Sequence, residues 1–141
     1  MRPERCSIKE SQLGPGAYGA VADDHLKRPR NLGKLADADG VGQVDEPNID
    51  TLVTVYLKVV QRPDGSRVVS EAGFRAFGCG GCIISGSVAT ELARGRALED
   101  LPQIDGAAIL GILADGLPPE QRYCADLAAR ALHLAGASVK L

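Results

Sequence analysis

Two cysteines with two residues between them stand near the middle of the chain, in the segment Phe-Gly-Cys-Gly-Gly-Cys at residues 77–82. Thiols at this spacing can hold one metal ion, form one disulfide, or pack as small buried side chains. The glycines beside Cys79 allow a sharp turn and leave backbone N–H groups open. If a helix begins near Cys82, both sulfurs lie at its positive end, where thiolates are stabilised. A functional site is therefore favoured over simple packing, which would not require the glycines.

The composition limits the classes of protein to consider. A chain of 141 residues is expected to form one domain with a real core. The net charge of −2 gives no basic surface for nucleic acid, and no apolar stretch has the length of a membrane span. We see no secretory signal, and four cysteines are too few for a disulfide-rich secreted scaffold. We therefore expect a protein of the reducing cytoplasm, where cysteines bind metals or react.

The first part of the chain is expected to be a flexible tail. Residues 1–16 mix charges with glycine and proline and show no apolar period. Cys6 lies in this tail and is interpreted as a bystander. A single domain is expected over residues 17–141. Its one basic cluster, residues 27–30, is interpreted as a solvated helix end, with a docking surface as the alternative.

An antiparallel hairpin is expected to lead into the cysteine pair. Residues 51–59 are rich in β-branched side chains and predict the clearest strand. Residues 62–65, Arg-Pro-Asp-Gly, predict a turn, because proline presets φ and Asp-Gly supplies positive φ. Residues 67–77 then return as a second strand. Residues 44–47 predict a short edge strand, after a glycine-rich loop at 37–42.

Helical patterns occupy most of the remaining chain. Apolar periods predict helices over residues 18–27, 82–94, 107–113 and 120–134. His25 on the first of them is interpreted as a surface or capping residue, and His133 on the last as solvated. Strands followed by helices indicate an α+β fold. We expect a small antiparallel sheet of about three strands packed against the C-terminal helices.

Several segments, in order along residues 18–136, together resemble the U-type iron–sulfur cluster assembly scaffolds, the family of IscU and the N-terminal domain of NifU. Residues 24–33 resemble the family's opening helix and the turn after it. Residues 74–80 resemble its Phe-Gly-Cys-Gly segment, and residues 89–95 the helix that follows. Residues 117–124 resemble its Leu-Pro-Pro segment with the last cysteine. The chain is identified as a divergent member, and the resemblance implies the same α+β fold.

The departures from the family concentrate at its cluster ligands. The family holds its cluster with three cysteines and an aspartate, and the first cysteine stands in a Cys-Gly-Asp segment before the long strand. Without a gap, Ile49, Asp50 and Thr51 fall on Cys, Gly and Asp, and both ligands are lost. With one residue inserted, Asp50 takes the place of the aspartate. Cys82 is gained where the family has a small apolar residue, and Tyr123 replaces the histidine before the last cysteine.

The resemblance implies that Cys79 is a cluster ligand and that Cys124 accepts sulfur. A [2Fe–2S] cluster has four protein ligands, and the candidates are Cys79, Cys82 and Cys124, with Asp50 as a labile oxygen donor. Core packing is the alternative for Cys82 and Cys124, and capping of a turn is the alternative for Asp50. Three thiolates and one carboxylate also suit tetrahedral zinc, so zinc stays the alternative to iron or a [2Fe–2S] cluster.

The resemblance implies a scaffold rather than an enzyme. It would bind iron, accept sulfur from a cysteine desulfurase, and build a [2Fe–2S] cluster for recipient apoproteins. The alternatives are a degenerate relative that serves as an accessory or structural subunit, and a zinc-binding or thiol-relay protein. The family's Hsp70-type chaperone reads a Leu-Pro-Pro-Val-Lys segment, in which Glu120 and Gln121 here replace the last two residues. We expect weak or no recognition, because desolvating an unpaired carboxylate is unfavourable.

Overall fold

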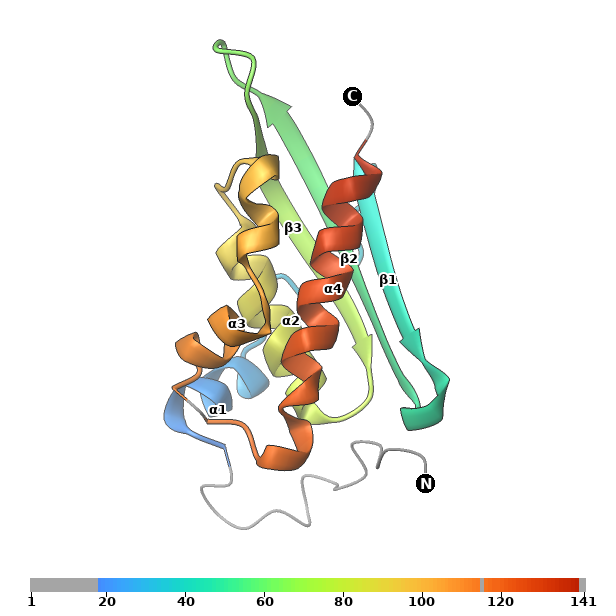
Figure 1. Cartoon of the computed structure of the whole chain (residues 1–141), viewed down its shortest axis with the longest axis vertical. Coiled ribbons are helices and arrows are strands. Elements are labelled where there is room, and N and C mark those ends of the chain that lie inside the picture. Colours follow the sequence, from blue (N-terminus) through green and yellow to red (C-terminus); the bar gives the residue numbers. More distant parts are fainter. Residues whose placement is uncertain (1–17, 115, 140–141) are drawn as a thin grey trace.

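The computed structural model describes residues 18–114 and 116–139. The expected tail, with Cys6, lies outside the described residues, so the division into tail and domain stays a prediction. Figure 1 shows the described part as two layers, with one sheet behind a layer of helices. Their order is α1 (Ala20–Lys27), β1 (Gly40–Glu46), η2 (Pro47–Ile49), β2 (Thr51–Gln61), β3 (Arg67–Phe77), α2 (Gly80–Ala93), η3 (Leu98–Gln103), α3 (Gly106–Ile112), η4 (Pro119–Gln121) and α4 (Tyr123–Ser138).

The sheet is antiparallel throughout and has the strand order β1-β2-β3. Val44 of β1 pairs with Val53 of β2, and Val55 of β2 pairs with Phe74 of β3. The predicted α+β fold with about three strands is confirmed. The predicted hairpin is present as well, and Gly65 in its turn has a φ of 89°, in the left-handed region that favours glycine.

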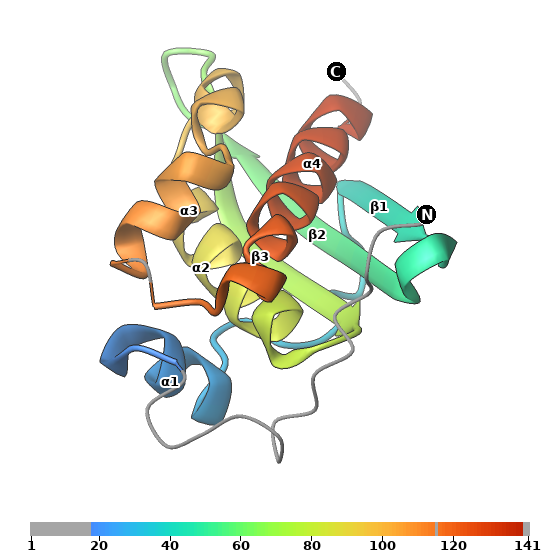
Figure 2. The same cartoon turned by 60° about the horizontal axis from the view of Figure 1, so that its bottom comes forward.

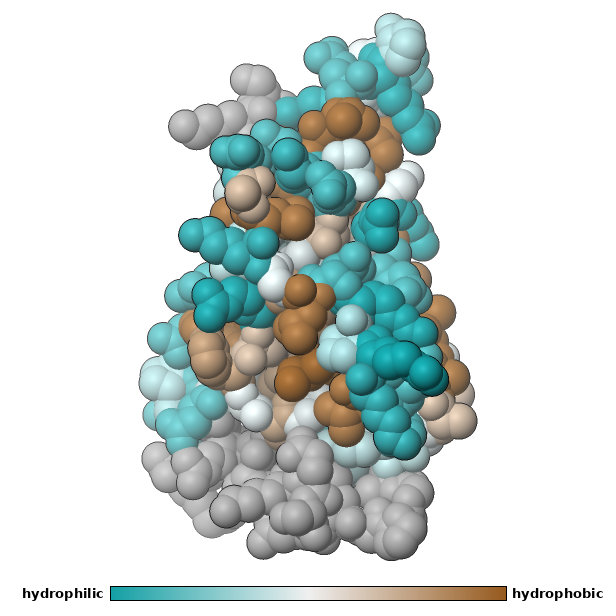
Figure 3. All heavy atoms as spheres, turned by 180° about the vertical axis from the view of Figure 1, so that it is seen from behind, coloured by the Kyte–Doolittle hydropathy of each residue, from teal (hydrophilic) through white to brown (hydrophobic). Residues whose placement is uncertain are grey.

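The helices cover one face of the sheet (Figures 1 and 2). On that side, Val53, Val55 and Phe74 are fully buried, together with Ile84 of α2 and Leu132 of α4. Burial of an aliphatic or aromatic side chain of this size contributes about 1.5–3 kcal/mol. The face of the molecule seen in Figure 3 carries apolar and polar side chains interspersed, as expected for an antiparallel sheet with one open face. Among the described residues, no helix has the length and apolar character needed to cross a membrane.

Strand β1 begins four residues earlier than the sequence predicted. The glycines that suggested a loop are needed instead for close packing of α4 on the strand. A Cβ at Gly42 would overlap the backbone of α4 at Ala131 and Ala135. A Cβ at Gly40 would overlap the same helix at the Ala135 carbonyl. The C-terminal half of helix α4 therefore lies directly on β1.

The interpretation of His25 as a surface or capping residue is wrong. His25 is buried, and its Nδ1 lies 2.7 Å from the Ser87 hydroxyl of α2. The same hydroxyl accepts a hydrogen bond from the backbone N–H of Arg30, so it can donate its own proton to Nδ1 of a neutral His25 ring. These bonds attach α1 and the turn after it to α2. His133 is not simply solvated either, because it is half-buried and its Nε2 bonds the Ile104 carbonyl at 2.8 Å.

The approach of α4 to β1 generates the first prediction. Gly42→Ala is expected to lower the free energy of unfolding by about 1–3 kcal/mol, because the added methyl overpacks a backbone contact. Gly111→Ala is the matched control, since nothing lies within 4 Å of its added Cβ. That control is expected to gain about 0.5–1 kcal/mol from helix propensity. Urea unfolding measures both, and an unchanged Gly42→Ala midpoint would show that α4 does not press on β1.

Burial of His25 generates a prediction on pH. Desolvation, with a smaller effect of the Arg30 charge, lowers the pKa of His25 below 6.5, against weaker opposing effects of Glu91 and Asp24. The unfolded chain then binds more protons than the folded one between the lowered pKa and 6.5, so stability falls as pH falls through that window. His25→Asn cannot titrate. The difference in unfolding free energy between wild type and variant should therefore change across pH 5.5–7.5, and a constant difference would contradict this account.

Candidate functional site

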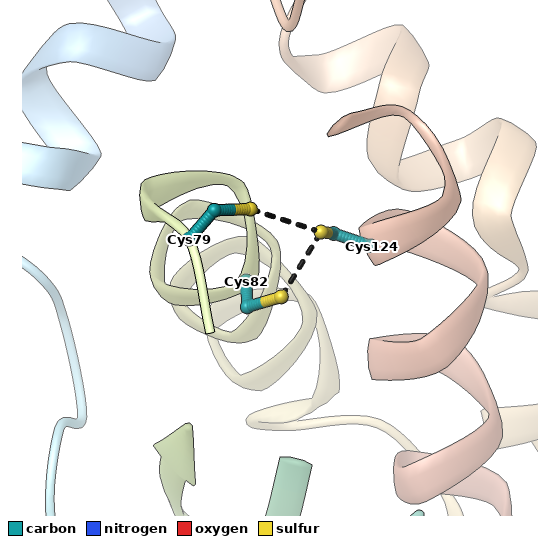
Figure 4. A group of neighbouring side chains, drawn as sticks. All are labelled: Cys79, Cys82 and Cys124. Atoms are coloured by element: carbon teal, nitrogen blue, oxygen red, sulfur yellow. Dashed lines mark hydrogen bonds between the residues drawn. The ribbon is translucent and has the colours of Figure 1, made fainter. Parts of the chain in front are cut away.

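Three cysteines from two helix starts meet at one end of the molecule. Cys79 precedes α2, Cys82 lies in its first turn, and Cys124 is the second residue of α4. The Cys82 and Cys124 sulfurs lie 3.0 Å apart, and those of Cys79 and Cys124 lie 3.5 Å apart. All three sulfurs are within 4.8 Å of one another. Figure 4 shows the side chains pointing toward a common point, so the Cys82 sulfur does not turn away into the core.

The three sulfurs differ in chemical state, although all are buried. Cys79 is 6% exposed, and Cys82 and Cys124 are fully buried. Cys82 and Cys124 carry free thiols, whereas Cys79 is disulfide-bonded. Only a thiolate is a metal ligand. Coordination by all three sulfurs therefore requires Cys79 to be reduced first.

A glycine allows the two helix starts to approach. A Cβ at Gly81 would lie 2.7 Å from Oε1 of Gln121 and 3.4 Å from Sγ of Cys124. The first of these contacts is closer than real Cβ atoms tolerate, so a side chain at this position would push α2 away from Gln121 in the η4 turn that leads into α4. The glycine between the cysteines thus has a packing role that brings Cys124 to the pair on α2.

The electrostatics of the site favour one negative charge shared between two sulfurs. The hydrogen bond from Cys124 lowers the pKa of Cys82. The same contact, together with burial, raises the pKa of Cys124. Both residues lie in first helical turns, where the positive helix end also stabilises a thiolate. The pair therefore loses a first proton readily and holds the second, and a bound cation is needed to ionise both.

The structure does not bring Asp50 into this group. Asp50 is exposed, ends the η2 turn with φ 50° and ψ 44°, and is not among the residues whose ligand atoms meet. Its left-handed backbone is one that glycine adopts easily. Thr51 is buried instead. A Cβ added to Gly78 would lie 3.3 Å from Oγ1 of Thr51 and 3.2 Å from the Cys82 sulfur, so the Thr51 hydroxyl lies close to this sulfur.

Two residues beside Cys124 were missed as parts of the site. Burial, followed by the charge of Cys124, raises the pKa of Tyr123 to about 12, and the Thr51 hydroxyl opposes this effect. Gln121 is fully buried and accepts a 2.9 Å hydrogen bond from the Tyr18 hydroxyl. Gln121 was expected to belong to a segment like the one that a chaperone reads in the family, but it is buried in the interior. Their nearness to Cys124 in the sequence, three residues before it for Gln121 and one for Tyr123, was the feature that could have indicated their place at the site.

Comparisons with known proteins agree with this geometry. Residues 17–140 match the family model described as NifU-like N terminal domain. The chain is 40% identical over 118 residues to the iron-sulfur cluster assembly scaffold protein IscU 1 of Archaeoglobus fulgidus, covering 84% of this chain and 73% of that protein. It is 36% identical over 122 residues to the scaffold protein IscU of Azotobacter vinelandii, covering 84% and 91%.

Solved structures support the fold. The N-terminal NifU-like protein from Brucella abortus superposes with a TM-score of 0.66 at 19% identity, over 88% of this chain and 94% of that one. A putative iron-sulfur cluster assembly scaffold protein for the SUF system, from Fervidobacterium islandicum, gives a TM-score of 0.66 at 18% identity, over 87% and 99%. At these identities the likeness concerns the arrangement of the sheet and helices alone.

The position of Asp50 generates the third prediction. In reduced protein, Asp50→Asn is expected to leave the affinity for Co²⁺ within about twofold, because Asn keeps the left-handed turn and no ligand is lost. Cys82→Ser is expected to weaken it by about tenfold or more, a change of about 1.4 kcal/mol. Titration followed by thiolate-to-cobalt absorption measures both variants. Equal losses in the two would restore Asp50 as a ligand.

Proposed function

We propose that this chain, which belongs to the family of NifU-like N-terminal domains, is an iron–sulfur cluster assembly scaffold. It binds iron and sulfur as cargo, builds a [2Fe–2S] cluster and passes it on. The observation that carries the proposal is the meeting of Cys79, Cys82 and Cys124 sulfurs within 4.8 Å. The curated relatives of similar length are named as scaffolds for this assembly. In this role the chain acts as a carrier, without turnover of its own.

The donor set fits a cluster that is held for a short time. A [2Fe–2S] cluster takes four protein ligands, usually thiolates. Three come from Cys79, Cys82 and Cys124, with Cys82 in place of the cysteine that is absent before β2. The fourth position is left for an exchangeable donor. A recipient thiol can enter at that position first, so transfer begins without breaking a cysteine–iron bond of the scaffold.

Sulfur acceptance follows from the contact between Cys82 and Cys124. As the Cys124 sulfur attacks the terminal sulfur of a desulfurase persulfide, the Cys82 thiolate takes the Cys124 proton across their 3.0 Å contact. The desulfurase cysteine leaves as a thiolate, and Cys124 carries the persulfide. Two electrons from an external reductant then release the terminal sulfur as sulfide for the cluster. The Cys124 role as sulfur acceptor therefore depends on Cys82 as its proton acceptor.

The proposed partners are a cysteine desulfurase and recipient apoproteins, in a reducing cytoplasm. Recognition by an Hsp70-type chaperone is expected to be weak or absent. Glu120 brings a carboxylate into the segment, and Leu117, Pro118 and Gln121 are buried. A chaperone that binds an extended peptide must first detach these side chains from the core, which adds an unfavourable term to binding.

Zinc is the second candidate cargo, because three thiolates and one further donor also form a tetrahedral zinc site. The geometry of the sulfurs suits either ion. The two differ in their spectra and in sulfide content, so a single preparation separates them.

Anaerobic reconstitution tests the proposed function. Protein reduced beforehand and given ferrous iron and sulfide is expected to form a labile [2Fe–2S] chromophore, and to pass it to an apoferredoxin. Cys79→Ser, Cys82→Ser and Cys124→Ser should each abolish or strongly weaken the chromophore, while Asp50→Asn serves as the matched control. A colourless protein with stoichiometric zinc would favour the zinc-binding alternative. Protein that holds neither metal would favour an accessory subunit.

A further inference from the structure

Two residues just before Cys124 carry buried donors without a hydrogen-bond partner. Native proteins pair nearly all buried polar groups, so each exception calls for an explanation such as an absent ligand. Among the described residues, four buried side-chain polar atoms lack a hydrogen-bond partner, namely Arg30 Nη1, Ser85 Oγ, Gln121 Nε2 and Tyr123 Oη. Two of the four belong to Gln121 and Tyr123, which precede Cys124 by three residues and one residue.

The amide of Gln121 is held in one orientation at the thiol site. Its Oε1 accepts the Tyr18 hydroxyl at 2.9 Å, and this bond leaves the two N–H groups of Nε2 as free donors. The side chain is fully buried, so solvent does not satisfy these donors. The side chain packs on Gly81, where an added Cβ would lie 2.7 Å from Oε1 of Gln121 and 3.4 Å from the Cys124 sulfur. The amide therefore borders the sulfurs from the η4 side.

The Tyr123 hydroxyl borders the same sulfurs. Its neighbours include the Cys124 and Cys82 thiols and the Thr51 hydroxyl. None of them forms a hydrogen bond of ordinary geometry with it, although the oxygen is buried. A phenol in this position can donate one O–H to an anion that enters the site.

We propose that Gln121 and Tyr123 form a donor pair that hydrogen-bonds the metal-bound sulfur at Cys124, either the thiolate itself or the sulfide beside it. The inference rests on the proposed function only in taking the cargo to be a metal–sulfur group. The two residues are positioning residues rather than metal ligands. No proton or electron is transferred. The donors stabilise negative sulfur once the metal is bound, and without it they have no hydrogen-bond partner within the protein.

Two consequences distinguish this role from packing. Partners that hydrogen-bond metal ligands typically change metal affinity by about 10–100-fold when they are removed. Hydrogen bonds to cluster sulfurs also set the reduction potential, and their loss lowers it because the reduced, more negative cluster loses more stabilisation. A residue that only fills space would change neither the ligand absorption nor the potential.

The test uses Tyr123→Phe and Gln121→Met, which remove the donors and nearly keep the volume. Tyr56→Phe on β2 is the matched control, because Tyr56 is buried beside residues 34–38, away from the cysteines. Reduced, metal-free proteins are first compared by thermal unfolding. Tyr123→Phe is expected to melt no lower than wild type apart from small packing changes, because its hydroxyl has no hydrogen bond to lose. Gln121→Met is expected to melt lower, because it also removes the oxygen that accepts the Tyr18 hydroxyl. A large loss in Tyr123→Phe would show that its hydroxyl is bonded within the protein and would overturn the proposal.

Co²⁺ is then titrated into each reduced protein. Both site variants are expected to bind Co²⁺ about tenfold more weakly and to shift the sulfur-to-cobalt absorption, whereas Tyr56→Phe should match wild type. Wild-type affinity and spectrum in both variants would overturn the donor pair, as would a wild type that binds no Co²⁺. If the cobalt results hold and no cluster forms on reconstitution, the proposed scaffold function fails while the donor pair stands. Where a cluster forms, its potential should be lower in both variants.

Discussion

The close contact between the first turns of α2 and α4 is the constraint on which the site depends. Cys124 is far from Cys79 and Cys82 in sequence, and the absence of a side chain at Gly81 leaves room for Gln121, in the turn that leads into α4, against α2. Helix α4 is itself set by its contact with β1, where Gly42 lies against its backbone. Small residues at these contacts therefore determine the distances between sulfurs. The aliphatic core supplies stability, but its side chains alone would allow several helix positions.

The same contact brings polar groups together in a buried region of the molecule. Two helix N-termini, buried thiols and the hydroxyls of Thr51 and Tyr123 share a region with little access to water. Neutral thiols satisfy such a region poorly, since sulfur is a weak donor and a weak acceptor. A cation with sulfur anions suits it better, because the helix ends favour negative ligands and the metal balances their charge. In this region the contact between the two sulfurs lowers the pKa of Cys82, and the same contact with burial raises the pKa of Cys124.

The sequence predicted the sheet, the hairpin and the helices because each has a local cause, such as β-branched runs, Asp-Gly in a turn, or an apolar period. It could not decide the direction of the Cys82 sulfur, which depends on where α2 begins. Helix α2 starts at Gly80, so Cys82 lies in the first turn and faces α4. His25 was misjudged because its burial depends on Ser87, 62 residues away. The start of β1 was missed because glycine indicates a loop locally, whereas its reason here is the helix across the sheet.

Three sulfurs meet at this site without a ligand from the segment before β2, because Cys82 on α2 joins Cys79 and Cys124. In the segment before β2, Asp50 adopts a left-handed backbone conformation and Thr51 is buried. Cys82 is instead part of helix α2. A ligand in a helix is held by the backbone hydrogen bonds of that helix, whereas a ligand in a turn before a strand moves with the turn. The thiols are thus concentrated on the two helices, and the side of Thr51 carries only weak donors. Exchange of the cargo is therefore expected to begin at that side, where no cysteine has to be displaced.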